Sequence, residues 1–311
     1  MTTTSNGRRI PVPAASSPSS LGGGQEHRAP ARFVRSARGF MRGWRAWLGL
    51  GILAATVLLS ALAPLIAPHN PETIDVLHRL KPPSVQSGHL LGTDEVGRDI
   101  LSRLLYGGRV SLVVGLSTIV LGGVGGSVLG VLAGYAGGRA DSLIMRVVDV
   151  QLAFPSLLLA IAILAVLGSS VTNVILVLSL ASWATFCRVA RAQTLAFRRA
   201  EFVEASRTIG APPRTIVWRH VAPNILGPLL VVASFGLAAN ILNEASLSFL
   251  GVGVPPTVPT WGGMLGSGRA YLRLAWWVAT FPGVALMLTV FAVNVLGDRV
   301  RDYLDPRTRR G

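Results

Sequence analysis

Three histidines, His69, His78 and His89, lie in one polar stretch and offer the widest chemistry in this sequence. Imidazole nitrogens are common metal ligands in proteins, so metal binding is the first chemistry to consider. The histidines are spaced nine and eleven residues apart, unlike the short spacings of zinc sites, and no cysteine lies among them. We therefore expect solvated loop histidines and no metal site.

The chain also lacks a motif for nucleotide hydrolysis. Its one lysine, Lys81, follows Leu80, whereas the lysine of a phosphate-binding loop follows a glycine. The metalloprotease pattern His-Glu-x-x-His and the hydrolase pattern Gly-x-Ser-x-Gly are absent as well. No catalytic constellation therefore supports a membrane-embedded enzyme. We expect a chain that is not an enzyme, binds no cofactor, and takes its energy from a partner or an ion gradient.

Two further polar groups flank apolar runs. Asp94, Arg98, Asp99 and Arg103 precede one run, and the four-residue spacing of Asp99 and Arg103 could form a helix-stabilising pair. The alternative is a contact with another protein outside the membrane. Three polar residues lie near the end of a later run. They could line a transport pathway, or they could form hydrogen bonds at the end of a helix. They are Asn240, Asn243 and Glu244.

The composition shows what must position these residues. Of 311 residues, 50% are hydrophobic and only 14% are charged, and the mean hydropathy is +0.53. About a quarter of a soluble domain is charged, so lipid is the expected solvent. In a soluble protein, the net charge of +15 would suggest nucleic-acid binding. Here the arginines lie between apolar runs, so we expect no nucleic-acid partner. The single cysteine, Cys187, excludes an internal disulfide.

Six apolar runs are long enough to cross a bilayer, which takes about 20 residues. They cover residues 47–67, 110–135, 143–167, 171–187, 225–247 and 276–296. The first could instead be a secretory signal, but it lies too deep in the chain and is too long. The third begins with Arg146, Asp149 and Gln151, so we expect its first turns to contact protein or the membrane interface. The fourth run is the shortest.

Basic residues are divided unevenly by these six spans, with 22 on one side and 7 on the other. The basic side of a membrane protein is the cytoplasmic side, so both termini and residues 188–222 should lie in the cytoplasm. Residues 1–45, rich in Ser, Pro, Gly and Arg, are predicted to be a disordered basic cytoplasmic tail. Residues 46–311 are predicted to be a membrane domain.

Glycines recur every four residues in the second run, at Gly122, Gly126, Gly130 and Gly134. Such a stripe lets two helix backbones approach closely in lipid. The partner could be a helix of this chain or of a second membrane subunit, and the pattern does not distinguish them.

A charged and kinked segment, residues 195–223, separates the fourth and fifth runs and is called the kinked segment below. Apolar residues recur at helical spacing and predict one apolar face, formed by Leu195, Phe202, Ala205 and Ile209. Gly210 fits a left-handed helix end, and Pro213 fits the first turn of a second helix that Pro223 should end. Two helices lying on the headgroups would explain the arginines but not the break. We favour docking into a groove of a soluble partner, which needs a defined angle.

The stretch EASRTIGAPPRTIVWRHVAP (204–223) resembles the signature of ABC importer permeases, which reads Glu-Ala-Ala, three residues, Gly, nine residues, Ile-x-Leu-Pro. Glu204, Ala205, Gly210 and Pro223 match it, whereas Ser206, His220 and Ala222 depart from it. The stretches LGTDEVGRDILSRLLYGGRVSL (91–112), NEASLSFLGVGVPPTVPTWGGML (243–265) and GDRVRDYLDPR (297–307) resemble dipeptide, oligopeptide and nickel permeases of the second, C-type subunit.

The resemblance implies an all-α membrane bundle of six helices with the MetI-like fold of type I ABC importers. It implies a homologous second permease, two ATPase subunits that use ATP, and a substrate-binding protein outside the cell membrane. Glu204, Ala205, Ser206, Gly210 and Pro223 would contact the ATPase. The cargo would be a dipeptide, an oligopeptide, a nickel chelate or a related solute. An ion-gradient-driven transporter is the alternative, although charged midplane sites typical of that class are scarce.

Overall fold

The computed structural model describes residues 44–304, and every regular element in that range is a helix. The helices follow in the order α2 (Trp44–Ala61), α3 (Ala63–Ile66), η1 (Val76–His78), α4 (Ile100–Ala136), α5 (Gly138–Leu152), α6 (Ser156–Leu167), α7 (Val171–Arg198), α8 (Glu201–Thr208), α9 (Pro213–Ile216), η2 (Val217–Val221), α10 (Ala222–Phe249), α11 (Trp261–Gly268), η3 (Arg269–Tyr271) and α12 (Trp277–Leu304). The predicted all-α class is confirmed. The predicted tail, residues 1–45, lies almost wholly outside the described residues, as does the chain from residue 305.

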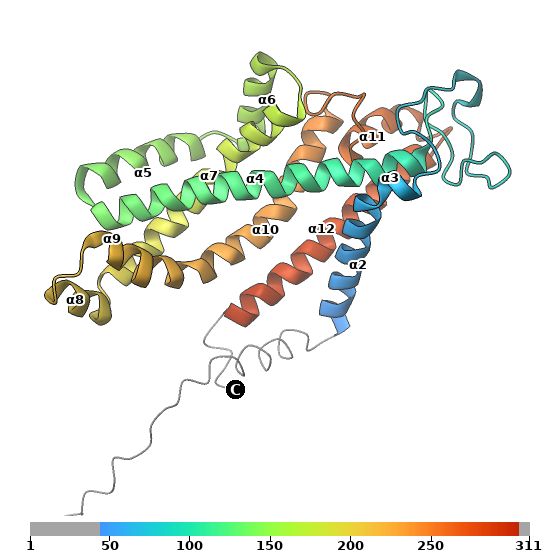
Figure 1. The fold of residues 1–311 in the computed structure, drawn as a ribbon. Coiled ribbons are helices and arrows are strands. Elements are labelled where there is room, and N and C mark those ends of the chain that lie inside the picture. The colour runs from blue at the N-terminus through green and yellow to red at the C-terminus, as the bar shows by residue number, and fades with distance from the viewer. Residues whose placement is uncertain (1–43, 305–311) are drawn as a thin grey trace, which may run out of the picture. The chain divides into compact units, whose positions relative to one another are not determined.

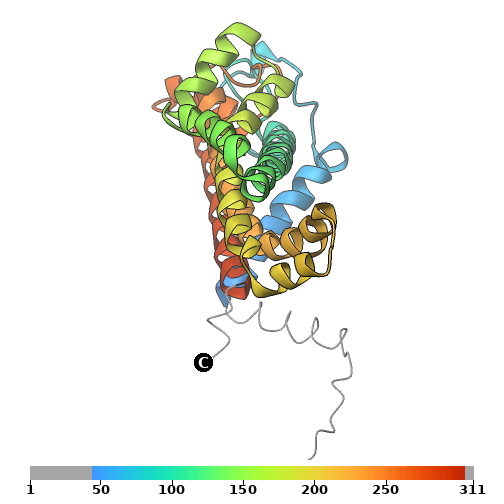
Figure 2. The ribbon, with the colours of Figure 1, turned by 90° about the vertical axis from the view of Figure 1, so that its left-hand side faces the viewer.

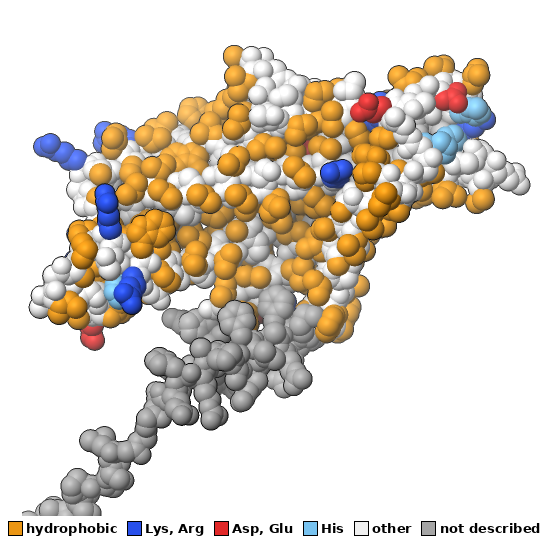
Figure 3. Space-filling model, in the orientation of Figure 1, with side chains coloured by type: hydrophobic (Ala, Val, Ile, Leu, Met, Phe, Trp, Pro, Cys, Tyr) orange, Lys and Arg blue, Asp and Glu red, His pale blue; other side chains and the backbone are white. Residues whose placement is uncertain are grey.

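Five helices of the described range are long and apolar enough to cross a membrane. They are α2, α4, α7, the continuous stretch Pro213–Phe249, and α12, and they coincide with five of the six predicted spans. The run predicted to be shortest belongs to α7, which extends over 28 residues. Hydrophobic side chains cover much of the bundle between its two ends (Figure 3). This surface suits a lipid solvent.

The third predicted span, residues 143–167, is not one straight helix. It is divided into α5 and α6, which meet at 88°. Pro155 lies at the break, where it lacks a backbone N–H and disfavours a helical conformation of Phe154. The described range therefore has five crossings, or six if the bent pair counts as one crossing.

The start of this broken span contacts protein, as predicted from its polar residues. Trp183 of α7 donates a hydrogen bond from Nε1 to Gln151 of α5 at 2.5 Å. Arg188 of α7 donates to Asp149 of α5 at 2.7 Å. The polar face of α5 is thus turned toward α7.

The glycine stripe of α4 packs against α7 along most of its length. A Cβ atom at Gly122, Gly126, Gly130 or Gly134 would lie less than 3.0 Å from a carbonyl oxygen of α7. Because α7 belongs to the same chain, the stripe is occupied by packing within the subunit. Helices can approach this closely in lipid only where side chains are small.

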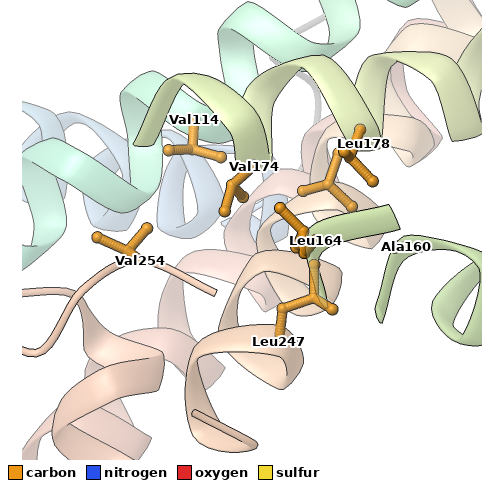
Figure 4. Close-up of a cluster of buried hydrophobic side chains, with 8 residues drawn as sticks. Val114, Ala160, Leu164, Val174, Leu178, Leu247 and Val254 are labelled. Carbon is orange, nitrogen blue, oxygen red and sulfur yellow. The ribbon is translucent and has the colours of Figure 1, made fainter. Parts of the chain in front are cut away.

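The helices form one bundle whose two ends differ. Buried side chains of α4, α6, α7 and α10 form a cluster that includes Val114, Leu164, Val174, Leu178 and Leu247 (Figure 4). The short helices α8 and α9 project at one end of the bundle, and the polar loop between α3 and α4 lies at the opposite end of α4 (Figures 1 and 2). The fold therefore separates the two polar regions that the sequence singled out.

Candidate functional site

The kinked segment consists of the end of α7, helix α8, a sharp turn, and the stretch α9–η2 that leads into α10. The predicted pair of short helices with a break at Gly210 is confirmed. The prediction that Pro223 ends the second helix is wrong, because α9 and η2 continue into α10 as one apolar stretch to Phe249. η2 is a π-helical turn, and Pro223, which has no N–H to donate, directly follows this irregular turn inside the continuous stretch.

Gly210 ends α8 in the left-handed conformation, with φ at +80°. Its N–H donates to the carbonyl of Arg207 at 2.9 Å, and the N–H of Ala211 donates to the carbonyl of Ser206 at 3.0 Å. This bond pair is the Schellman motif, which satisfies carbonyls at a helix end. A Cβ at Gly210 would meet nothing within 4 Å, so conformation rather than space favours glycine.

Three side chains of the kinked segment anchor it to the bundle. Val203 of α8, Ile216 of α9 and Val221 of η2 are all buried. They pack in one cluster with Phe186 and Ile225, which lie on α7 and α10. The angle of the projection is therefore set by packing against two long helices.

A second set of apolar side chains on the kinked segment faces outward. Phe202 is 44% exposed, Ile209 84% and Trp218 75%, and Ala205 is exposed as well. Helical spacing placed Phe202, Ala205 and Ile209 on one face with Leu195, which is half-buried. The structure shows that this face is the uncovered one, because Val203 makes the inward contact of α8. Large apolar side chains left open on a polar projection mark an interaction surface.

Polar contacts join the two halves of the kinked segment. Ser206 Oγ donates to the carbonyl of Phe202 at 2.8 Å and lies 3.3 Å from His220 Nε2. The rings of Phe202 and His220 are 6.0 Å apart. Glu204 is exposed on the same short helix, α8.

Arginines connect the kinked segment to the end of α4. The guanidinium groups of Arg198 and Arg207 lie 6.0 and 5.6 Å from the ring centre of Tyr135. Cation–π contacts of this kind stabilise by about 0.5–1 kcal/mol at exposed sites. Sequence reasoning missed Tyr135, because only the fold brings the end of α4 beside α8.

Two of the three polar residues of α10 that were candidates for lining the transport pathway contact other helices of this chain. Asn240 Nδ2 donates to Ser182 Oγ of α7 at 3.0 Å. Glu244 is fully buried and accepts hydrogen bonds from Ser111 Oγ at 2.9 Å and from Ser248 Oγ at 2.8 Å. Asn243 is half-buried. A pathway-lining role for these residues stays a prediction.

The four charged residues before the second run are mostly buried. Asp94 accepts a hydrogen bond from Arg98 Nε at 2.6 Å and lies 3.7 Å from Arg103 Nε. The predicted Asp99–Arg103 pair is wrong, because Arg103 turns to Asp94 and to the carbonyl of Pro71. Asp99 caps α4 by accepting from the N–H of Ser102 at 2.8 Å. The group holds the loop onto α4, and its contact with another protein stays a prediction.

The expectation of solvated loop histidines is wrong for His89. Its side chain is 13% exposed, and Nδ1 lies 3.0 Å from Asp99 Oδ1. His78 is 42% exposed and hydrogen-bonds Asp75 at 2.6 Å, which holds the pKa of that carboxyl below its usual value. His69 lies beside His89, with ring centres 4.7 Å apart.

Comparisons with known proteins cover most of the chain. Residues 126–310 match the family described as binding-protein-dependent transport system inner membrane component, and residues 32–83 match the N-terminal TM domain of oligopeptide transport permease C. The chain is 43% identical over 265 residues to the di/tripeptide transport system permease protein DppC of Pseudomonas aeruginosa, covering 84% of this chain and 88% of the relative.

Two further relatives and one solved structure agree with these matches. The chain is 45% identical over 277 residues to the dipeptide transport system permease protein DppC of Escherichia coli, covering 87% of this chain and 92% of the relative. It is 41% identical over 273 residues to the glutathione transport system permease protein GsiD of Pectobacterium atrosepticum, covering 86% of this chain and 90% of that relative. The inward-facing MetNI methionine ABC transporter shares the fold, with a TM-score of 0.54, 20% identity, and coverage of 65% of this chain and 96% of that one.

Proposed function

This chain belongs to the binding-protein-dependent transport system inner membrane components, among the C-type peptide permeases, and we propose that its kinked segment receives the motion of a separate ATPase. The family is one of membrane permeases of ABC importers, which favours this reading over an ion-gradient-driven transporter. The observation that carries the proposal is the uncovered apolar face formed by Phe202, Ala205 and Ile209 on a rigidly held projection.

This face has the properties that a groove in a soluble partner requires. Phe202 and Ile209 are large side chains that are 44% and 84% exposed, and aromatic and aliphatic anchors of this kind contribute most of the binding energy of interfaces. Glu204 and Arg207 are exposed charged residues of the same short helix, and charged side chains are usual in the polar rim of an interface. A short helix with fixed ends can seat in a groove without ordering itself first.

The packing of the kinked segment explains how a push would reach the membrane. Val203, Ile216 and Val221 tie the segment to α7 and α10, so a displacement of α8 must move both long helices. The glycine stripe locks α7 to α4, which extends the moving body. Rigid-body motion of this kind is a common form of gating.

The proposed cargo is a dipeptide, an oligopeptide or a related small solute, nickel chelates included. Its support is the similarity to permease proteins of dipeptide, di/tripeptide and glutathione transport systems. The proposed partners are a homologous second permease, two ATPase subunits and an extracytoplasmic substrate-binding protein. ATP is used by the ATPase subunits, and the proposed transport role requires no cofactor on this chain.

The proposed orientation places both termini and the kinked segment in the cytoplasm. Its support is the distribution of basic residues, 22 on that side against 7 on the other. The polar loop between α3 and α4 then faces outward, where a substrate-binding protein could approach.

The experiment is a Gly210→Val substitution in the assembled transporter, measuring peptide uptake and substrate-stimulated ATP hydrolysis. A β-branched side chain in the left-handed region costs about 1–2 kcal/mol, a factor of about 5–30 in an equilibrium constant. We expect the subunit to reach the membrane while uptake falls by about this factor.

Gly251→Val is the matched control, because Gly251 has φ at +82° and a Cβ there also meets nothing within 4 Å. Gly251 follows α10 with the same pair of bonds, from its own N–H to the carbonyl of Ser248 and from the N–H of Val252 to the carbonyl of Leu247, both at 3.1 Å. The Gly251→Val variant carries the same strain away from the kinked segment and should leave uptake near normal. Normal uptake by the Gly210→Val transporter, or equal losses in both variants, would contradict the proposal.

A further inference from the structure

Three metal-ligating side chains converge beside the start of α4, and the proposed transport role uses none of them as ligands. The ligand atoms of His69, His89 and Asp99 all lie within 4.8 Å of one another. Nδ1 of His89 lies 3.0 Å from Asp99 Oδ1, and Nδ1 of His69 lies 3.8 Å from the same oxygen. The two imidazoles and the carboxylate therefore converge on one position, which is called the histidine cluster below.

The spacing suits a small divalent cation. Zinc binds imidazole nitrogen at about 2.0–2.1 Å and carboxylate oxygen at about 2.0–2.2 Å, so neighbouring tetrahedral ligands lie roughly 3.3 Å apart. The two distances to Asp99 Oδ1, 3.0 and 3.8 Å, bracket that separation. The separation between the ligand nitrogens of His69 and His89 is at most 4.8 Å, and the His69 side chain is 41% exposed, which leaves its ring room to adjust.

Hydrogen bonds hold Asp99 in the orientation of a ligand. Its Oδ2 accepts from the N–H of Ser102 at 2.8 Å and from Ser102 Oγ at 2.7 Å, which leaves Oδ1 turned to the histidines. Ser102 Oγ in turn accepts from the backbone N–H of His69 at 3.1 Å. Metal ligands in proteins are oriented by outer hydrogen bonds of this kind.

Backbone hydrogen bonds hold the residues of the histidine cluster in place, and an open pocket makes the cluster accessible to solvent. Isolated antiparallel bridges join Ser84 to His89 and Thr93 to Asp99. His69 lines an open pocket of about 530 Å³, through which a hydrated ion can approach. A simple ion pair of His89 with Asp99 explains the 3.0 Å contact, but it leaves the placement of His69 against the same carboxylate oxygen unexplained.

We propose that His69, His89 and Asp99 bind one divalent transition-metal ion of the zinc type, with water completing the shell. Nitrogen and carboxylate ligands together favour zinc and similar borderline cations over calcium or magnesium. The bound ion ties the segment that follows α3 to the first turn of α4. This proposal replaces the expectation of no metal site that the histidine spacing suggested.

The test is a zinc titration of the full chain, purified in detergent without a polyhistidine tag and stripped with a chelator. Competition with a chromophoric chelator should show one zinc ion per chain. His69→Ala and Asp99→Asn should each weaken binding at least about tenfold, the smallest loss expected even for an outer hydrogen-bonding partner. The Asn side chain retains an oxygen to cap α4, so Asp99→Asn should remain folded.

His78→Ala is the matched control, because His78 lies in the same loop but bonds Asp75 and stands outside the cluster. It should bind zinc like the wild type. Cobalt provides a second readout, since Co²⁺ at a four-coordinate site gives visible absorption that should appear in the wild type and be lost in His69→Ala. Equal zinc affinity of the wild type and His69→Ala, or an equal loss in His78→Ala, would overturn the proposal. Unfolding temperatures of the metal-free variants exclude misfolding, and His69→Asn replaces any His69→Ala that fails this check.

Discussion

At the scale of single residues, two departures from the family signature contact each other. Ser206 stands where the signature has alanine and His220 where it has isoleucine, and their side chains are 3.3 Å apart. A polar contact therefore connects α8 to η2 at a place where the signature has apolar residues. The spacing of the signature is kept, so the angle between the two helices can be the same with a different contact.

Glu244 provides a prediction at this scale. Removing its carboxylate in Glu244→Ala leaves the hydroxyls of Ser111 and Ser248 without their acceptor and opens a cavity between α10 and α4. We expect the free energy of unfolding to fall by about 2–4 kcal/mol, measured as a lower thermal unfolding midpoint in detergent.

Glu244→Gln is the comparison, because it keeps the size and an acceptor oxygen, and it should cost about 1 kcal/mol. Uptake by a stable Glu244→Gln transporter separates the two roles: a pathway residue changes uptake, and a packing residue does not. An alanine variant as stable as the wild type would show that the buried hydrogen bonds contribute nothing.

At the scale of elements, the contact of α4 with α7 determines how the kinked segment is held. The stripe of four glycines lets the backbones of α4 and α7 meet. Arg198 of α7 lies over Tyr135 of α4, and Arg191 of α7 donates to Asp141 of α5. The base of the kinked segment is therefore fixed on two sides.

Gly126→Ala tests this contact, with the adjacent Gly125→Ala as control. A Cβ at position 126 collides with the carbonyl of Trp183, whereas one at position 125 meets nothing within 4 Å. Overpacking should lower the free energy of unfolding by about 1–3 kcal/mol at 126, and the change at 125 should be neutral or slightly stabilising. Equal unfolding midpoints for the two variants would mean that the helices do not depend on the stripe.

Some of these elements could be predicted from the sequence because their causes are local. Gly210 and Pro213 act on their own turn, so the kink was predictable. The effect of a proline in an apolar run is not local: Pro228 and Pro282 lie inside continuous helices, yet α5 and α6 part at Pro155. Whether neighbouring helices satisfy the freed backbone groups decides the outcome, and hydropathy does not report this.

The candidate sites were also predictable only where their causes are local in the sequence. The spacing of Phe202, Ala205 and Ile209 predicted an apolar face, but only the fold shows that Val203 takes the inward position. The meeting of His69 and His89 depends on a loop that folds back through a bridge at Ser84, and their spacing gives no sign of it. Periodicity finds faces of helices, whereas convergent loops need the tertiary structure.

At the scale of the whole bundle, we propose different functions for the two ends. The kinked segment presents apolar side chains at one end of the bundle, and charged side chains and histidines gather at the other end (Figure 3). The long helices α4, α7 and α10 connect the ends, so a push on α8 can alter contacts about one bilayer away. We propose that the apolar face of the kinked segment seats against an ATPase subunit.

Cysteine cross-linking in the assembled transporter tests this contact. The single native cysteine, Cys187, is buried, so an added cysteine should react without strong background. Ile209→Cys places a thiol on the proposed contact, and Leu77→Cys places an equally exposed one, 89% against 84%, in the loop before α4. We predict that a bifunctional thiol reagent joins position 209, but not position 77, to an ATPase subunit. No cross-link from position 209, with its thiol instead open to a membrane-impermeant reagent outside the cell, would contradict the account.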